Sequence, residues 1–535
     1  MKRALVATLW LWLWTAPSAT ASTPDLTSNQ WVQQGDGYSQ QDRHLEAISA
    51  YEKAIELAPG RRIELLSRIA RQHLWLEESA IAVRLFDEYL VSYPFDCEAR
   101  SLRALALSWN GKLKQARKAY EALSEECPEM EWDALLGAAR VARWLERPSE
   151  ARRIYRDIER SAPERRKLDA LLGLALVDLM QDNNRAALKA LNELWEMGYS
   201  DPAAAEARAV ATLRLRSSNL ARKILVDTRN RDIRGDNLDR LTEELEWRRH
   251  PVVRPQLTMF QDADGTSYQR SQIEFEQRIG EVSTSFGVGG SRLTREGTDP
   301  VIRSRTMQAG AEYRLNEWFA FRADGAFETI SEMDFDPFLG QLQTVLTPSD
   351  RTRLDFAVAR ILVPDNFEAM LNRLTGRYYS GGLEQRFGNR DSVAISVDRT
   401  EWSAGNQRMR YRLSPMHRFE GIPQLSVHWP TVYQRYDQAF EFFLFSPREY
   451  WETGPEVQIE WRPNRQWNTS FRGRVGMQRE TGHEWSALTS MQGRIEREFG
   501  RHWAFEAGAG YSNSNLASES GFRRTSVTVV LGYRF

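Results

Sequence analysis

The chain has 535 residues, with 72 lysines and arginines against 73 aspartates and glutamates, and a formal net charge of −1. This length leaves room for two or more domains. The near-neutral charge gives no reason to expect nucleic acid as a partner. The seven histidines are scattered and give no support to a metal centre.

The first residues have the pattern of a secretory signal peptide. Lys2 and Arg3 form a basic start, an apolar run of about ten residues follows over 5–14, and small residues at 19–21 suit cleavage before Ser22. The apolar run is too short to span a bilayer, which disfavours the alternative of an uncleaved anchor. We therefore expect residues 1–21 to be removed and residues 22–39 to form an N-terminal segment.

Residues 40–243 are predicted to form an all-α solenoid of about six tetratricopeptide repeats. A small residue recurs every 34 to 36 positions, which is the period of this repeat: Ala47, Ala82, Ala116, Ala151, Ala187 and Ala221. In the first four copies an aromatic residue follows four positions later and a proline closes the copy. The alanine lets two helices approach, the aromatic ring fills the gap, and the proline ends the second helix. Such solenoids usually hold a partner in a groove.

Both cysteines fall in the third copy, at the start of its first helix (Cys97) and at the end of its second (Cys127). These two ends lie side by side in a helical hairpin. In an oxidising compartment a disulfide is plausible; the alternative is two unrelated buried thiols.

After a linker at 244–254, the apolar period changes from that of a helix to that of a strand. Ile273, Phe275 and Ile279, for example, alternate with charged residues, and several later segments repeat the pattern. Residues 255–535 are therefore predicted to form an antiparallel transmembrane β-barrel of sixteen strands. Fourteen is the alternative, because the strands expected to start near residues 338 and 407 have the weakest patterns. Short turns should alternate with longer loops at 293–303, 329–337, 363–375, 436–448 and 514–521.

Charged residues between lipid-facing positions must point into a lumen. The lumen-facing candidates are Glu274, Glu276, Arg278, Arg322, Asp324, Arg353, Asp355, Asp398, Glu456, Glu460, Arg462 and Glu506. Carboxylates outnumber arginines in this set, and such an acidic excess would favour a cationic glycan. The alternative is that these residues pair across strands and stiffen the barrel.

The last strand alternates up to the terminal residue, with Leu531, Tyr533 and Phe535 on one face. It looks like the closing strand of bacterial outer-membrane β-barrels. In that family the terminal aromatic residue is read by the barrel assembly machinery, which makes these three residues the expected assembly signal.

A signal peptide, helical repeats and a C-terminal sixteen-strand barrel together resemble the bacterial exopolysaccharide export porins, those for poly-N-acetylglucosamine and cellulose above all. The segment from Phe445 to Tyr450, F-S-P-R-E-Y, is similar to a motif of the cellulose-export barrels. The resemblance implies an outer-membrane porin with its repeats in the periplasm. The lumen would conduct a polysaccharide, and the repeats would recruit periplasmic or inner-membrane synthesis or modification proteins.

Two other functions stay open, a translocator of surface lipoproteins with a client-binding repeat domain and a structural outer-membrane protein. Barrels of the first kind usually have fourteen strands. The sequence contains no G-x-S-x-G, H-E-x-x-H, Walker or C-x-x-C motif, so we expect neither an enzyme nor a cofactor or metal site.

Overall fold

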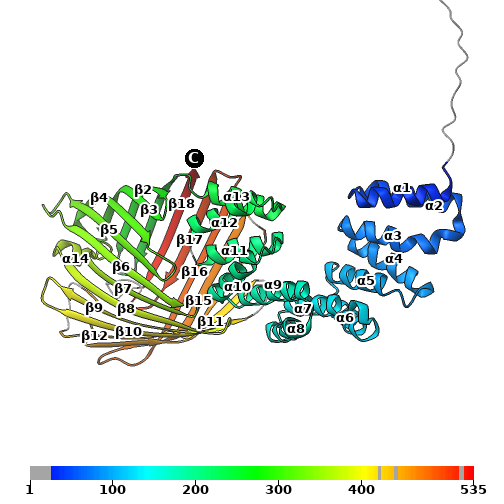
Figure 1. The fold of residues 1–535 in the computed structure, drawn as a ribbon. Helices are drawn as coiled ribbons and strands as arrows, with labels where there is room; N and C mark the ends of the chain where they lie inside the picture. The colour runs from blue at the N-terminus through cyan, green and yellow to red at the C-terminus, as the bar shows by residue number, and fades with distance from the viewer. Residues whose placement is uncertain (1–25, 216, 420–422, 439–443, 465, 517–522) are drawn as a thin grey trace, which may run out of the picture. The chain divides into compact units, whose positions relative to one another are not determined.

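The computed structural model describes residues 26–215, 217–419, 423–438, 444–464, 466–516 and 523–535 (Figure 1). The expected signal peptide lies outside these residues. The chain divides into two compact units, up to Ala170 and from Leu171 onward, and each is considered by itself.

The described part of the first unit consists of antiparallel helix pairs, and the same pairing continues in the second unit. The helices are α1 (Ser28–Gln40), α2 (His44–Leu57), α3 (Arg62–Trp75), α4 (Ser79–Ser92), α5 (Cys97–Trp109), α6 (Leu113–Glu126), α7 (Glu131–Trp144), α8 (Pro148–Ser161), α9 (Glu164–Met180), α10 (Asn184–Glu196), α11 (Pro202–Arg214), α12 (Ser218–Asn230) and α13 (Asp236–Trp247). Short 3-10 turns, η1 (Pro59–Arg61) and η2 (Pro128–Met130), begin with proline directly after α2 and α6.

The repeat positions read from the sequence form the core of the helix pairs. All six repeat alanines are fully buried, and the aromatic rings that follow four of them are at most 4% exposed. Gly137 shows how tight this packing is, because a Cβ there would lie 2.4 Å from the ring of Tyr120. A side chain at Gly137 would therefore force the two helices apart.

The helical part begins earlier than the expected boundary at residue 40. Helix α1 starts at Ser28 and pairs with α2, and a capping box between Thr27 and Gln30 fixes its start. The sequence pattern was anchored on the second helix of each repeat, which is why the first helix of the first pair was assigned to the N-terminal segment.

The second unit contains a single closed antiparallel sheet. Its strands are β1 (Val252–Asp262), β2 (Thr266–Ile279), β3 (Val282–Arg295), β4 (Thr298–Arg314), β5 (Phe319–Ile330), β6 (Phe338–Ser349), β7 (Thr352–Leu362), β8 (Thr375–Phe387), β9 (Asp391–Trp402), β10 (Gln407–Phe419), β11 (Gln424–His428), β12 (Thr431–Tyr436), β13 (Glu449–Thr453), β14 (Glu456–Trp461), β15 (Trp467–Glu480), β16 (Ser486–Phe499), β17 (Trp503–Ser512) and β18 (Arg524–Arg534). One short helix, α14 (Phe367–Leu371), lies between β7 and β8.

The eighteen segments make sixteen strands across the barrel wall. Segments β11 and β12 both pair with β10, and β13 and β14 both pair with β15. Each pair is therefore one strand, interrupted at Trp429-Pro430 and at Gly454-Pro455, where proline cannot donate to the ladder. Pairing of β1 with β18 closes the sheet. The expected sixteen-strand barrel is confirmed, including strands β6 and β10, which had the weakest sequence patterns.

One of the expected long loops is wrong. Strand β3 continues to Arg295 and β4 begins at Thr298, so the predicted loop at 293–303 is a two-residue turn around Gly297, whose φ is 72°. Polar residues there suggested a loop, but they belong to strands that extend past the apolar band. Among the described residues, no helix is long and apolar enough to cross a membrane.

Candidate functional site: the barrel lumen

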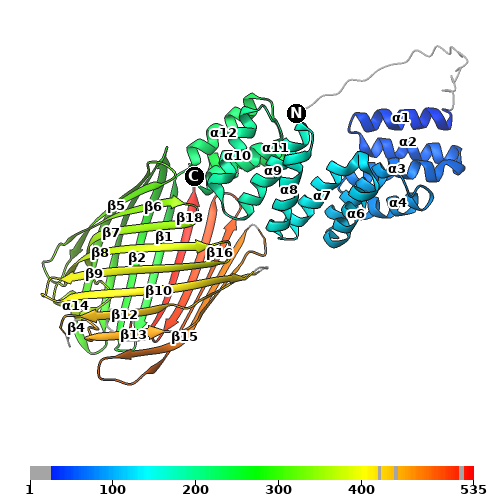
Figure 2. The ribbon, with the colours of Figure 1, turned by 60° about the horizontal axis from the view of Figure 1, so that its bottom comes forward.

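The two ends of the barrel differ. At one end, called here the near end, lie the C-terminus and helices α10–α13; α14 lies at the other, the far end (Figures 1 and 2). Strand β1 starts at the near end directly after α13, and β18 returns to it, as an even number of strands requires.

The outer face of the barrel carries a band of exposed apolar side chains. Ile273, Val288, Met307 and Phe327 are direct cross-strand neighbours on β2 to β5 and are 42% to 62% exposed. Such a continuous apolar surface is unusual for a protein in water and is the expected surface of a barrel in lipid.

The sequence-predicted lumen candidates lie on the opposite face. Across neighbouring strands, Glu276 pairs with Ser285, Ser285 with Gly310, and Gly310 with Asp324, so Glu276 and Asp324 lie on the same face. A parallel series of pairs places Arg278 and Arg322 on this face as well. Tracing the register around the barrel puts all the candidates within strands on this one face; Arg462 lies directly after β14 and contacts Asn468 at 3.3 Å. Whether they contact a polymer stays a prediction.

Several of these candidates form ion pairs with each other or with neighbouring arginines. Nε of Arg322 lies 2.7 Å from Asp324, and Arg353 lies 3.7 Å from Asp355. Glu456 and Glu506 lie 3.4 and 2.7 Å from Arg472 and Arg494, and Glu276 pairs with Arg254. The last three pairs join neighbouring strands, as the stiffening alternative requires, whereas the first two lie within one strand each.

Sequence reasoning missed a row of arginines on β10. Arg408, Arg410, Arg412 and Arg418 occupy alternate positions on the same face as Asp398, whose Cα pairs with that of Arg410. Arg408 is only 3% exposed and lies 3.6 Å from Asp398. With these included, the described lumen face carries about as many arginines as carboxylates. The expected acidic excess is therefore wrong, because β10 had a weak apolar pattern and its arginines were left out.

The loop between β7 and β8 folds into the lumen at the far end. Phe367 and Met370 of α14 are 2% and 1% exposed, and they pack against lumen-facing apolar residues of β1 to β5, among them Phe260 and Ile302. Leu444, from the loop after β12, packs with Val363, Leu374 and Trp402 in a second cluster. Side chains from two loops thus cover part of the far end from inside.

An arginine on β18 ties this loop to the opposite wall. Nη1 of Arg524 lies 2.6 Å from Asp365, while Nε and Nη2 lie 2.6 and 2.9 Å from Asp262 on β1, the Cα partner of Arg524. The guanidinium also lies 3.7 Å from the ring centroid of Phe260. Because β7 and β18 are seven strands apart on the shorter way around the sixteen-strand wall, a loop that makes this contact must cross the lumen.

At the near end, helix α10 is fixed to the turns of the barrel. The backbone N–H and the guanidinium of Arg185 donate to Asp350 at 2.8 and 3.1 Å, and Nη2 donates to the carbonyl oxygens of Glu317 and Thr347. Burial raises the pKa of Asp350, and the hydrogen bonds and charge of Arg185 oppose that shift. At α13, Trp247 Nε1 donates to the carbonyl oxygen of Arg501 at 3.1 Å.

The residues of the expected assembly signal lie on the outer face of β18. Leu531 and Phe535 are 39% and 54% exposed. The ring of Tyr533 packs on Trp503 and Phe535, with centroids 4.7 and 5.1 Å apart. These side chains form part of an aromatic girdle at the near end; recognition by an assembly machinery stays a prediction.

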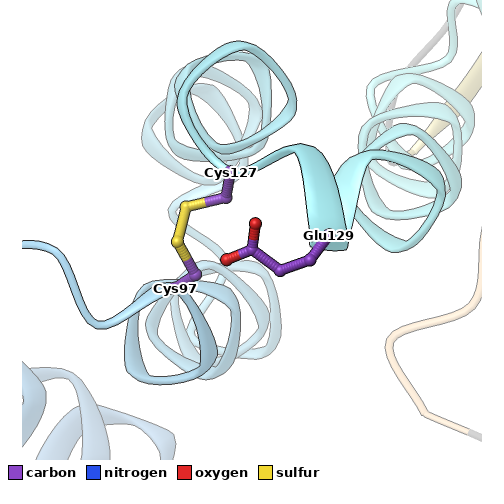
Figure 3. A group of neighbouring side chains, drawn as sticks. All are labelled: Cys97, Cys127 and Glu129. Atoms are coloured by element: carbon purple, nitrogen blue, oxygen red, sulfur yellow. A yellow bond between two sulfur atoms is a disulfide. The ribbon is translucent and has the colours of Figure 1, made fainter.

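Cys97 and Cys127 form a disulfide between α5 and the end of α6, with their Cα atoms 6.0 Å apart. Glu129 lies beside it (Figure 3), and the three residues are close enough to resemble a metal site. Sulfur atoms bonded to each other are not the thiolates that bind metals, so this cluster is a covalent staple between the two helices.

Comparison with known proteins identifies the barrel. Residues 294–511 match the family described as PgaA membrane beta barrel domain. Among solved structures, a bacterial polysaccharide outer membrane secretin is 16% identical, covering 54% of this chain and 99% of its own, with a TM-score of 0.46. A tetratricopeptide repeat protein from Parabacteroides merdae is 17% identical, covering 41% of this chain and 85% of its own, with a TM-score of 0.34. No curated protein matches.

The family match covers most of the barrel, and helix pairs with the repeat period precede it. These findings support an outer-membrane location and a transport function without catalysis. Over residues 294–511 the barrel matches the PgaA membrane β-barrel family model, and with the helix pairs that precede it the chain has the architecture of the tetratricopeptide-repeat and β-barrel type of exopolysaccharide export porins.

Proposed function

We propose that this protein conducts a single extended polysaccharide strand through its lumen, from a periplasmic near end to an extracellular far end. The observation that carries the proposal is the closed barrel whose inner face carries charged side chains on most strands and whose far end holds an apolar cluster under a loop that folds inward. A polymer that passes the far end along this wall would displace the α14 loop, so the barrel would be a gated conduit.

The lumen-facing candidates would act together, each through weak contacts. A sugar polymer offers hydroxyl or amino groups at every residue, and the paired carboxylates and arginines offer acceptors and donors at many depths. Weak contacts that are replaced one by one allow sliding, whereas one tight site would stop it. The near balance of charge gives no preference for a cationic polymer over a neutral one.

The helical repeats would lie in the periplasm and bind the proteins that make or modify the polymer. Two features support this part of the proposal. The repeat chain reaches the barrel at the near end, where β1 starts and β18 ends. In addition, α10 and α13 hold fixed contacts to the turns there, so a partner bound to the last repeats would be held next to the entrance.

The test is single-channel conductance of the full chain in planar bilayers, with and without soluble oligomers of glucose, N-acetylglucosamine and glucosamine. We expect a pore that one class of oligomer blocks transiently. Glu456→Gln and Glu460→Gln should change the block duration, and Glu296→Gln, in an exposed turn, should not. A pore that every oligomer leaves unblocked would refute polysaccharide conduction and favour a protein client or a structural role.

A further inference from the structure

Arginines on the outer face of the barrel gather at its far end. The strand register places them on the same face as the lipid-facing apolar band, beyond its last apolar residues, and all are exposed: Arg292, Arg303, Arg305, Arg360, Arg377 and Arg399. At the near end, the outward-facing Arg497 instead packs over aromatic rings, with its guanidinium 4.7 and 4.5 Å from the ring centroids of Trp467 and Phe499. The two rims of the apolar band therefore differ in charge.

Arg360 and Arg377 are direct neighbours across β7 and β8, which run side by side at the front of Figure 2. Two like charges in this position repel each other and destabilise a strand pair. Among the described residues, no carboxylate forms an ion pair with either arginine. The corresponding pair on β3 and β4 is partly neutralised, because Arg303 lies 3.1 Å from Glu332. The arginine pair on β7 and β8 would therefore be stabilised by an anion from outside the chain.

An apolar groove of about 600 Å³ lies on the outer face of β6 to β9, next to these arginines. Gly381 leaves a gap in its wall, and Arg399, which lies 2.5 Å from Glu401, is at its far end. A groove of similar size over β18 and β1 to β3 has no charged residue among its described lining residues. Apolar chains would fit both grooves, but an anionic headgroup would find a charged partner only at the first. The larger side chains of the first groove include Leu342, Phe356, Val358, Tyr379 and Val397.

We propose that this site, the β6–β9 groove with Arg360, Arg377 and Arg399, binds a phosphorylated glycolipid of the outer leaflet, the lipid A part of lipopolysaccharide. Its acyl chains would fill the groove, and its phosphates would lie where the apolar lining ends. Three guanidinium groups against the one carboxylate of Glu401 leave a net positive charge, and arginine binds phosphate through two parallel hydrogen bonds. Basic pockets at membrane interfaces bind anionic lipid headgroups in this way.

Two features favour this lipid over a phospholipid. Three adjacent strands spread the guanidinium groups over about 10 Å, which suits a headgroup with two phosphates better than one with a single phosphate. The arginines also lie at the far end, which is the extracellular end in the proposed function. The inference rests on the proposed function in this respect alone.

The test is native mass spectrometry of the full chain in detergent, titrated with doubly phosphorylated lipid A, with singly phosphorylated lipid A and with phosphatidylglycerol. We expect the doubly phosphorylated form to bind most tightly. Arg377→Gln should weaken its binding about tenfold, as expected for the loss of one charge-assisted hydrogen bond. Arg497→Gln, at the near rim, is the matched control and should bind lipid A like the unmodified protein.

A second variant tests the groove without changing any charge. Gly381→Leu should weaken lipid A binding by filling the space for an acyl chain. The strand should tolerate the change, since a Cβ at Gly381 would lie 3.6 Å from the ring of Phe356, an ordinary contact distance. Heat-modifiable mobility in gel electrophoresis verifies that each variant has a folded barrel.

The outcomes separate this site from the conduction of polysaccharide. Lipid A that binds Arg377→Gln and the unmodified protein equally would overturn the site, and so would equal weakening in Arg497→Gln, because attraction would then be unspecific. Phosphatidylglycerol that binds as tightly as lipid A would refute the assignment to the glycolipid. Selective weakening in Arg377→Gln, together with a pore that no glycan blocks, would support the site and refute conduction. A pore blocked by a glycan, together with unchanged lipid binding in Arg377→Gln, would refute the site alone.

Discussion

Replacing Asp365 by asparagine should weaken the contact with Arg524 that holds the β7–β8 loop across the lumen. The carboxylate of Asp365 accepts a hydrogen bond from Arg524 Nη1 at 2.6 Å, and their side chains are 27% and 13% exposed. Arg524 keeps its two contacts to Asp262 in the variant, so the seam between β1 and β18 remains closed. Hydrogen bonds to charged groups contribute about 1.5–3 kcal/mol, and asparagine can still accept one neutral hydrogen bond. We therefore expect the variant to lose about 1.5 kcal/mol of the free energy that holds the loop in place, which changes the equilibrium between the held and the released loop about tenfold.

The assay is the ratio of open to closed time of the full chain in planar bilayers. Asp365→Asn should raise this ratio about tenfold, and raising the salt concentration should raise it in the unmodified protein as well, because salt screens the pair. Asp336→Asn is the matched control, since Asp336 is exposed in a neighbouring loop at the far end. An unchanged ratio in Asp365→Asn would refute the view that this ion pair holds the loop across the lumen.

Three further predictions concern other parts of the chain. Cys97→Ser should lower the free energy of unfolding of the first unit by about 3–4 kcal/mol, the value for a loop of this length; thermal unfolding with and without reductant measures it, and equal curves would contradict it. Arg185→Ala should destabilise the docking of α10 by about 3 kcal/mol, because Asp350, whose side chain is only 11% exposed, then loses its charged partner and keeps only the backbone N–H of residue 185. Hydrogen exchange of the α10 amides should accelerate, and unchanged exchange would count against this contact. Phe535→Ser should reduce the amount of heat-modifiable barrel in cells, while Phe387→Ser, at another exposed aromatic position, should not.

Most of the fold could be predicted because each part repeats a short period. In the helical part the alanine spacing determines which faces pack, since a larger residue cannot fit between two close helices. In the barrel the alternation of apolar and polar residues determines which face meets lipid. The strand starts predicted near 338 and 407 coincide with those of β6 and β10, although neither segment alternates cleanly.

The contents of the lumen were less predictable, for a physical reason. The alternation of apolar and polar residues assigns a side chain to one face of the sheet, but it does not predict which side chain of another strand or loop lies next to it. Arg524 could not be connected with Asp365 from the sequence, because 158 residues lie between them and only barrel closure brings them together. The arginines of β10 did carry a signal, since R-M-R-Y-R has the period of a strand. They were missed because apolar residues, and not charges, were used to recognise strands.

The charge pairing of the lumen constrains how a polymer could move through it. An arginine that already holds a carboxylate, as Arg322 holds Asp324, has part of its hydrogen-bonding capacity occupied, so a passing sugar must compete with the existing partner. When a sugar hydroxyl takes the place of the carboxylate, one charged contact is replaced by weaker ones, and the free energy of the complex between polymer and wall changes little. A wall of paired charges therefore presents many shallow sites, whereas a wall of unpaired carboxylates would hold a cationic polymer at deep ones. Cutting one pair, for example by Asp324→Asn, should for this reason lengthen the block by an anionic oligomer, because Arg322 would then be free to bind it.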